Sequence, residues 1–216
     1  MDRRKALKNM GLSLGYAVAT PTLLGIMQSC KDTTPTMEWT PDFFSKEEGS
    51  VLTHLVDIIL PKTDTPSATE VQVNLFIDKF ANEVMEKEQQ DFVKMTFGKF
   101  IKKALAASKK ELASDLTPED LEPVLANALN VTKDQEKEQQ RALEAYQINI
   151  KEGKSEELNE DLACYASASQ LRGMTIWGYK TSAYVGEKVL SYLPLPGEYI
   201  GCGDVETLSG GKAWSL

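Results

Sequence analysis

Residues 45–68 read SKEEGSVLTHLVDIILPKTDTPSA, and this stretch decides the fold class. Ser45 followed by Glu48 is the pattern of a capping box, in which both side chains satisfy backbone N–H groups at the start of a helix. Apolar residues then recur at helical spacing until Pro61, which cannot continue a helix. The stretch therefore predicts an amphipathic helix that ends in a turn-rich loop at residues 61–67.

The same helical spacing returns along the rest of the chain. It predicts further helices at residues 73–84, 92–105, 117–129 and 133–150, and a last helical region at 155–193. Gly173 and Gly178 fall in that last region, where they mark either a break or a close approach of the backbone to a neighbour. With no alternating strand pattern, the sequence predicts an all-α fold, an irregular bundle of about five to seven helices with an extended C-terminal tail.

The first thirty residues have the composition of an export signal. A basic head, an uncharged middle and a small residue before a cleavage point form a signal peptide, here residues 1–29. The head resembles the twin-arginine signal, Ser/Thr-Arg-Arg-x-Phe-Leu-Lys, at Arg3, Arg4, Leu7 and Lys8. Proteins exported by that route cross the membrane already folded. We therefore expect the chain, or a partner that travels with it, to fold before export.

The end of the signal leaves three alternatives for the mature N-terminus. The segment Ile-Met-Gln-Ser-Cys resembles a lipobox, with the small Ser29 preceding Cys30, although Met27 stands where leucine is usual. A lipid on Cys30 would anchor the protein to a membrane. An uncleaved anchor and ordinary cleavage are the alternatives, because the apolar stretch approaches the about 20 residues that span a bilayer. We expect lipidation, with residues 30–44 as a tether to a single helical domain at 45–216.

The net charge of the chain limits the kinds of molecule that it could bind. The chain has a net charge of −8, and removal of residues 1–29, which hold four basic residues and one acidic residue, makes it −11. Nucleic-acid affinity depends on neutralising phosphates with lysine and arginine, so this balance argues against nucleic acid. It argues equally against electrostatic attraction to an anionic lipid surface.

Two cysteines remain after Cys30. In an oxidising compartment Cys164 and Cys202 could pair as a disulfide. The alternative is two free thiols, one buried in a helix and one in a tight turn between Gly201 and Gly203. Neither forms a Cys-x-x-Cys pair, so neither metal binding nor thioredoxin-like chemistry is indicated.

The sequence contains no recognisable catalytic set. His54 is the only histidine, which excludes a Ser-His-Asp triad and a paired-histidine zinc site. Asp57, Asp64 and Asp78 could hold a cation, but capping of helix ends is the better interpretation. Glycine-rich nucleotide motifs and Cys-x-x-Cys-His are also missing from the sequence. We therefore expect this chain to carry no cofactor of its own.

Aromatic residues gather near the C-terminus. Trp177, Tyr179, Tyr184, Tyr192 and Tyr199 lie close to prolines and glycines. Such residues bury a large area and keep a polar group, so their density suits a protein interface. The alternative is that they close the core of a small bundle.

Motifs at both ends of residues 45–203 resemble the gluconate 2-dehydrogenase subunit 3 family. The similar segments are LVDIILPKTDTPSA at 55–68, FID at 76–78, GYKTS at 178–182 and PGEYIGC at 196–202. Family members are small subunits, with twin-arginine signals, of membrane-associated dehydrogenases of sugars, sugar acids or polyols. The resemblance implies a large FAD-dependent partner subunit and, commonly, a cytochrome c subunit. FAD and haem would then belong to the partners.

The leading hypothesis is an accessory subunit, without catalytic residues, that assists folding, export and docking of a flavoprotein in the periplasm or cell envelope. Its candidate contacts lie in the 61–66 loop and the aromatic C-terminal region: Asp57, Pro61, Thr63, Asp64, Thr65, Pro66, Trp177, Tyr179, Tyr184, Tyr192, Pro196, Gly197 and Tyr199. The alternative is a stand-alone envelope lipoprotein that binds a small ligand or metal through His54, Asp57 and Asp64.

Overall fold

The structure is a computed structural model that describes residues 39–154, 157–195, 197–198 and 200–215. The chain divides into two compact units, Met1–Trp39 and Thr40–Leu216, and all the described helices lie in the second unit. The predicted export residues Arg3, Arg4, Leu7 and Lys8 and the predicted lipid site Cys30 lie outside the described residues. These assignments stay predictions.

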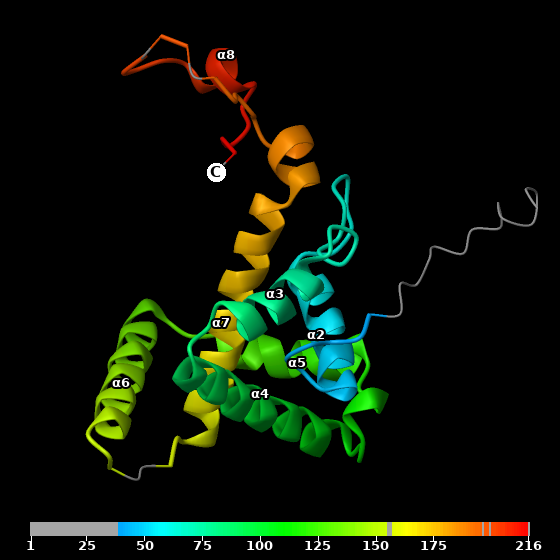
Figure 1. The fold of residues 1–216 in the computed structure, drawn as a ribbon, viewed down its shortest axis with the longest axis vertical. Helices are drawn as coiled ribbons and strands as arrows, with labels where there is room; N and C mark the ends of the chain where they lie inside the picture. The colour runs from blue at the N-terminus through cyan, green and yellow to red at the C-terminus, as the bar shows by residue number, and fades with distance from the viewer. Residues whose placement is uncertain (1–38, 155–156, 196, 199, 216) are drawn as a thin grey trace, which may run out of the picture. The chain divides into compact units, whose positions relative to one another are not determined.

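The described residues are mostly helical, and the all-α prediction is confirmed (Figure 1). In chain order the elements are α2 (Lys46–Ile59), α3 (Val73–Glu83), α4 (Lys87–Ser108), the 3₁₀ helix η1 (Ala113–Asp115), α5 (Pro118–Leu129), α6 (Lys133–Lys151), α7 (Glu160–Thr181), the π-helix η2 (Val185–Val189) and α8 (Val205–Ser209). The only β contact in the described part is an isolated bridge between Ser191 and Trp214. None of the helices described is both long and apolar enough to cross a membrane.

The first described helix begins where the capping box predicts. The Glu48 N–H donates to Ser45 Oγ at 3.1 Å, and the Ser45 N–H donates to a Glu48 carboxylate oxygen at 2.8 Å. Both N–H groups would otherwise lack a partner at the helix start. α2 ends at Ile59, two residues before Pro61.

Helix α7 is the centre of the core. It crosses α4, with which it makes its most extensive contacts, and also contacts α2, α3 and α5 (Figure 1). Its buried face is built largely from small residues, Ala163, Cys164, Ala166, Ser167 and Ala168, which allow neighbouring backbones to approach closely. The larger buried side chains come from the surrounding helices and include Leu52, Leu55, Val56, Val73, Ile77, Phe97, Phe100, Ile101, Leu121 and Leu125. Burial of each Leu, Ile, Val or Phe side chain stabilises the fold by about 1.5–3 kcal/mol.

The two glycines of α7 do not break the helix, which runs without interruption to Thr181. An ideal Cβ on Gly178 would lie 2.6 Å from Phe76 Cδ1, so this glycine permits the close approach that the sequence allowed as one alternative. Gly173 has no neighbour within 4 Å of such a Cβ. The helical spacing would allow Ile176 to face the core, but its side chain is 42% exposed because it lies on the outer face of the helix.

Contacts with the helical unit begin at residue 42, before the predicted start of the domain at residue 45. Residues 42–44 belong to the predicted tether, yet the backbone N–H groups of Asp42, Phe43 and Phe44 donate to the Asp78 carboxylate at 2.7, 3.1 and 3.0 Å. Phe44 is buried, with its ring centroid 5.2 Å from that of Phe97. The tether prediction is therefore wrong for these residues, because a buried carboxylate on α3 binds their backbone.

The disulfide considered for Cys164 and Cys202 is not formed, and both thiols are free. Cys164 is buried near the start of α7, whereas Cys202 is exposed beyond its far end. The helix carries the chain about 25 Å from Cys164 to Thr181, and a disulfide requires Cα atoms less than about 7 Å apart.

Candidate functional site

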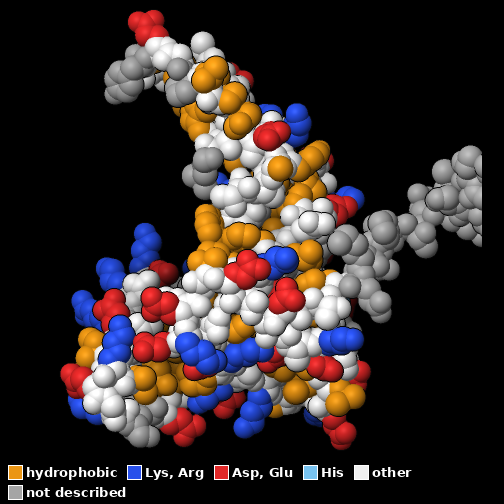
Figure 2. Space-filling view, viewed as in Figure 1, with side chains coloured by type: hydrophobic (Ala, Val, Ile, Leu, Met, Phe, Trp, Pro, Cys, Tyr) orange, Lys and Arg blue, Asp and Glu red, His pale blue; other side chains and the backbone are white. Residues whose placement is uncertain are grey.

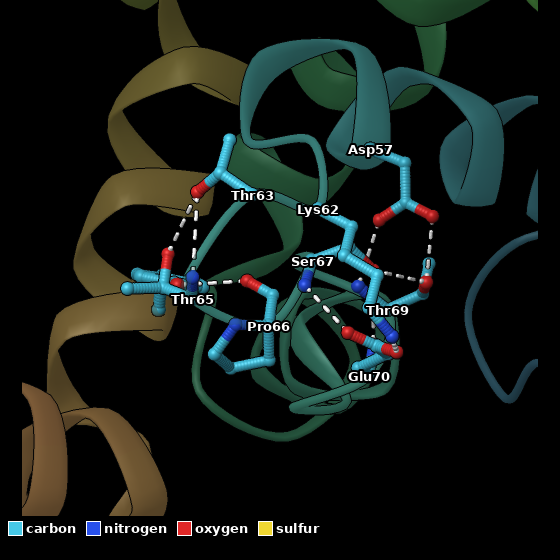
Figure 3. Close-up of polar contacts among 9 residues, drawn as sticks. Asp57, Lys62, Thr63, Thr65, Pro66, Ser67, Thr69 and Glu70 are labelled. Atoms are coloured by element: carbon cyan, nitrogen blue, oxygen red, sulfur yellow. Dashed lines mark hydrogen bonds and ion pairs between the residues drawn. The ribbon is translucent and has the colours of Figure 1, made fainter.

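The Asp57 carboxylate holds the loop after α2 in place. It accepts the Thr69 N–H at 2.9 Å and the Thr69 hydroxyl at 2.6 Å (Figure 3). Asp57 therefore points into its own fold and closes the loop. It does not cap a helix end, because Thr69 lies in the turn before α3. Asp57 was predicted to contact the partner protein directly, but its carboxylate binds Thr69 and so fixes the position of the loop.

Further contacts fix the shape of the loop. The Lys62 ammonium pairs with Glu70, whose other carboxylate oxygen accepts the Ser67 N–H at 2.9 Å (Figure 3). The hydrogen bond from Lys62, together with that from Ser67, lowers the pKa of the Glu70 carboxyl. The Thr63 N–H donates to the Thr65 carbonyl at 3.0 Å. A short loop with this many internal contacts presents a defined surface.

The loop tip faces solvent. Pro61, Thr63 and Asp64 are exposed, and Thr65 and Pro66 are half-buried. The predicted loop contacts other than Asp57 are therefore accessible to a partner.

One hydrogen bond joins the two halves of the predicted interface. The Tyr179 hydroxyl, near the end of α7, donates to the Pro66 carbonyl at 2.8 Å, across 113 positions of sequence. Tyr179 is half-buried in this contact. The loop after α2 therefore contacts the end of α7 at Tyr179.

An aromatic cluster that the sequence did not predict lies on another side of α7, because residues two apart on a helix do not share a face. The Trp177 ring lies edge-on to the rings of Phe76 and Phe80, with centroid distances of 5.0 and 5.3 Å. Trp177 stays 41% exposed. In the sequence, Phe76 and Phe80 indicated only the helix at residues 73–84, because a 3.6-residue period cannot show which rings meet a residue about 100 positions away.

The C-terminal segment extends the apolar surface. Tyr184 is 57% and Tyr192 is 51% exposed, so these side chains do not close the core, which was the alternative interpretation. The same segment exposes further apolar side chains, Leu193, Leu195, Ile200, Val205 and Trp214. Figure 2 shows hydrophobic side chains gathered around this segment, while charged side chains cover the lower helices. Gly197 is exposed, and Pro196 and Tyr199 lie outside the described residues.

The side chains considered for a metal do not come together as a ligand set. His54 is half-buried on α2, Asp57 binds Thr69, and Asp64 is exposed at the loop tip. Among residues 39–154, 157–195, 197–198 and 200–215, no group of three or more His, Cys, Asp or Glu side chains could hold a metal ion.

Comparison with known families matches residues 46–197 to gluconate 2-dehydrogenase subunit 3. The chain belongs to this family. The resemblance predicted from the sequence is confirmed, and the matched range contains both the loop after α2 and the end of α7. The family is a subunit of a multi-subunit dehydrogenase, which implies an oxidoreductase partner. No curated protein and no solved structure matches the chain.

Proposed function

We propose that this gluconate 2-dehydrogenase subunit 3 family member is the small, non-catalytic subunit of an FAD-dependent dehydrogenase of sugars, sugar acids or polyols. It docks the large flavoprotein subunit through one face, built from the loop at residues 61–66, the end of α7 and the C-terminal segment. The observation that carries this proposal is the hydrogen bond from Tyr179 to Pro66, which joins the loop at residues 61–66 to the end of α7.

The chemistry of that face suits a protein partner. Trp177, Tyr184 and Tyr192 leave large aromatic surfaces exposed. Contiguous exposed apolar surface on a soluble domain marks an interaction site, and Trp and Tyr contribute strongly to binding energy at interfaces. The ordered loop beside them adds polar groups that are already positioned, so less conformational entropy is lost on binding.

We assign the redox cofactors to the partner chains. FAD belongs to the large subunit, and haem to a cytochrome c subunit where one is present. The sequence supports this division because it contains neither a dinucleotide-binding glycine motif nor a Cys-x-x-Cys-His haem attachment motif.

We further propose that the small subunit assists folding of the flavoprotein and takes it through the twin-arginine route on the signal at Arg3 and Arg4. A lipid on Cys30 then holds the complex at the membrane of the cell envelope. Mass spectrometry of the mature N-terminus tests this step. A diacylated Cys30, lost in Cys30→Ser, is expected, and an unmodified terminus contradicts it.

Co-purification tests the docking proposal. A C-terminally tagged full-length chain, expressed in its native host and extracted from membranes, should bring down a large polypeptide with flavin absorbance. Tyr184→Asn should reduce the flavin recovered per tagged chain by about tenfold, because aromatic anchors dominate interface energies. Leu112→Asn is the matched control, since Leu112 is 61% exposed, against 57% for Tyr184, and lies in the loop after α4. Equal recovery from both variants, or no flavoprotein with the unmodified chain, contradicts the proposal.

A further inference from the structure

A second apolar surface begins at Phe80, which also packs against Trp177. It is a groove of about 810 Å³ between the α3–α4 turn, the first turns of α4 and the C-terminal half of α6. Its apolar lining includes Phe80, Val84, Phe92, Met95, Tyr146 and Ile150. Val84 and Ile150 are 61% and 45% exposed, so the groove is open to solvent.

Helix α6 forms one wall and is held by few contacts. The Tyr146 ring centroid lies 6.2 Å from that of Phe92, the Tyr146 hydroxyl is 3.9 Å from Met95 Sδ, and Arg172 pairs with Glu136 at 4.0 Å. None of the 19 residues of α6 is buried. Most helices of globular proteins are stabilised by burying an apolar face, whereas on the apolar face of α6 Leu143 and Tyr146 are only half-buried and Ile150 is exposed.

The spacing of the lining side chains matches a helical ligand. Phe80 and Val84 are four residues apart on one wall, Phe92 and Met95 three apart, and Tyr146 and Ile150 four apart. Such rows receive the side chains at positions i, i+3 or i+4, and i+7 of an amphipathic helix. Met95 and the neighbouring Met85 add flexible side chains that adapt to the shape of a bound apolar group.

The charges at the rim indicate the polarity of the occupant. Glu86, Glu88 and Asp91 line the side near the start of α4, and Lys151 lies on the α6 side. Asp91 pairs with Lys87, whereas Glu88 has no ion-pair partner among the described residues. The excess of acid favours lysine or arginine on the occupant near the start of α4.

Other occupants fit this groove less well. A small molecule is usually oriented by buried polar groups, but the charged lining residues are all exposed. An anionic bilayer would be repelled by the acidic rim. A second copy would bring another acidic chain, of net charge −8, against the same rim.

We propose that the groove between α3, α4 and α6 binds an amphipathic helix of a partner protein, with an apolar stripe toward Phe80, Val84 and Tyr146 and a basic residue toward Glu88. Phe80 also packs against Trp177, so the groove borders the proposed flavoprotein docking face at that ring, while its other lining residues lie outside that face. Helix binding can be tested on the isolated mature chain without the flavoprotein, so failure of one proposal leaves the other standing.

The probe is a fluorescent helical peptide of about 18 residues, with a leucine stripe at i, i+3 and i+7 and lysines at one end. Binding to the mature chain is measured by fluorescence anisotropy, beside a twin peptide with glutamate in place of lysine. We expect saturable binding of the lysine peptide and about fivefold weaker binding of its twin. Val84→Asn should weaken binding about tenfold, and the equally exposed control Leu112→Asn should leave it unchanged. Leu112 lies beyond the opposite end of α4, about 33 Å long.

Charge reversal gives an independent readout. Glu88→Lys should invert the preference between the two peptides, while Glu122→Lys, exposed on α5, should not. No saturable binding, or equal loss in Val84→Asn and Leu112→Asn, overturns the proposal. So does equal affinity of the two peptides, or a dimer in sedimentation that Val84→Asn dissociates, since a second copy would then occupy the groove.

Discussion

The missing side chain of Gly178 lets the Phe76 ring approach α7 closely, next to Trp177 of the proposed docking face. The ideal Cβ position on Gly178 lies 2.6 Å from Phe76 Cδ1 and 3.0 Å from Cε1, so a methyl group cannot fit without moving the ring. Phe76 in turn packs against Trp177. We predict that Gly178→Ala lowers the free energy of unfolding by about 1–3 kcal/mol, as overpacking does elsewhere, despite the higher helix propensity of alanine. Urea denaturation of the mature chain measures it.

Gly173 is the matched control for that prediction. It lies in the same helix, is exposed, and has nothing within 4 Å of an added Cβ. Gly173→Ala should therefore stabilise the protein by about 0.5–1 kcal/mol through helix propensity alone. If both variants change stability in the same direction, the close packing of Gly178 on Phe76 does not matter energetically.

The two thiols of the helical unit differ enough to be distinguished chemically. Cys164 is 1% exposed and its burial raises the pKa of the thiol, which reduces the reactive thiolate. Cys202 is exposed. In a mature chain carrying Cys30→Ser, we predict that a maleimide modifies Cys202 promptly and Cys164 only after unfolding. Peptide mapping by mass spectrometry assigns the sites. Protection of both cysteines until a reductant is added would instead indicate a disulfide.

At the scale of an element, the start of α5 carries a pH-dependent contact. The Asp120 carboxylate accepts hydrogen bonds from Lys110 Nζ at 2.5 Å and from the Thr117 N–H at 2.8 Å. The Lys110 hydrogen bond, followed by those from Thr117, lowers the pKa of Asp120 from 3.8 to about 2. A lowered pKa means that the native state favours the charged carboxylate. Its contribution to stability is therefore complete above the ordinary value and is lost as the pH falls through the lowered one.

The predicted quantity is the difference in melting temperature between Asp120→Asn and the unmodified chain, followed across pH. Asp120→Asn should be less stable than the unmodified chain at neutral pH, and the gap in melting temperature should stay constant down to the ordinary pKa of 3.8 and close by about pH 2. Glu122→Gln is the control, because Glu122 is exposed on the same helix and has no ion pair among the described residues. Thermal scans from pH 7 to 2 measure both. A gap that is independent of pH would exclude the carboxylate as its cause.

The elements themselves were largely readable from the sequence, because their signals are local. The capping box at Ser45 and Glu48, the proline at residue 118 and the helical period act within one or two turns. The tether boundary was wrong for a non-local reason: the Asp78 carboxylate binds residues 42–44 from another helix. Composition at Phe43 and Phe44 gives no hint of that partner.

Across the whole helical unit, local sequence signals likewise identify the segments of the candidate sites but not the contacts that bring them together. The loop at residues 61–66 and the end of α7 were each identified by motif, but the hydrogen bond from Tyr179 to Pro66 that joins them is a product of packing. The groove beside α6 was missed although Tyr146 and Ile150 already gave α6 an apolar stripe. Periodicity shows that a stripe exists, but it does not show whether the stripe is covered.

The C-terminal segment should be separable from the stability of the rest of the helical unit. No described residue after Gly186 is buried, while Tyr192, Leu195 and Trp214 are exposed. Deletion of residues 191–216 should therefore change the melting temperature of the mature chain by less than about 4 °C, since few apolar contacts are lost. The same deletion should abolish co-purification of the flavoprotein, because it removes most of the exposed apolar surface from the proposed docking face. Full recovery of flavoprotein by the shortened chain would confine docking to the 61–66 loop and α7, and a large fall in melting temperature would show that the segment stabilises the fold.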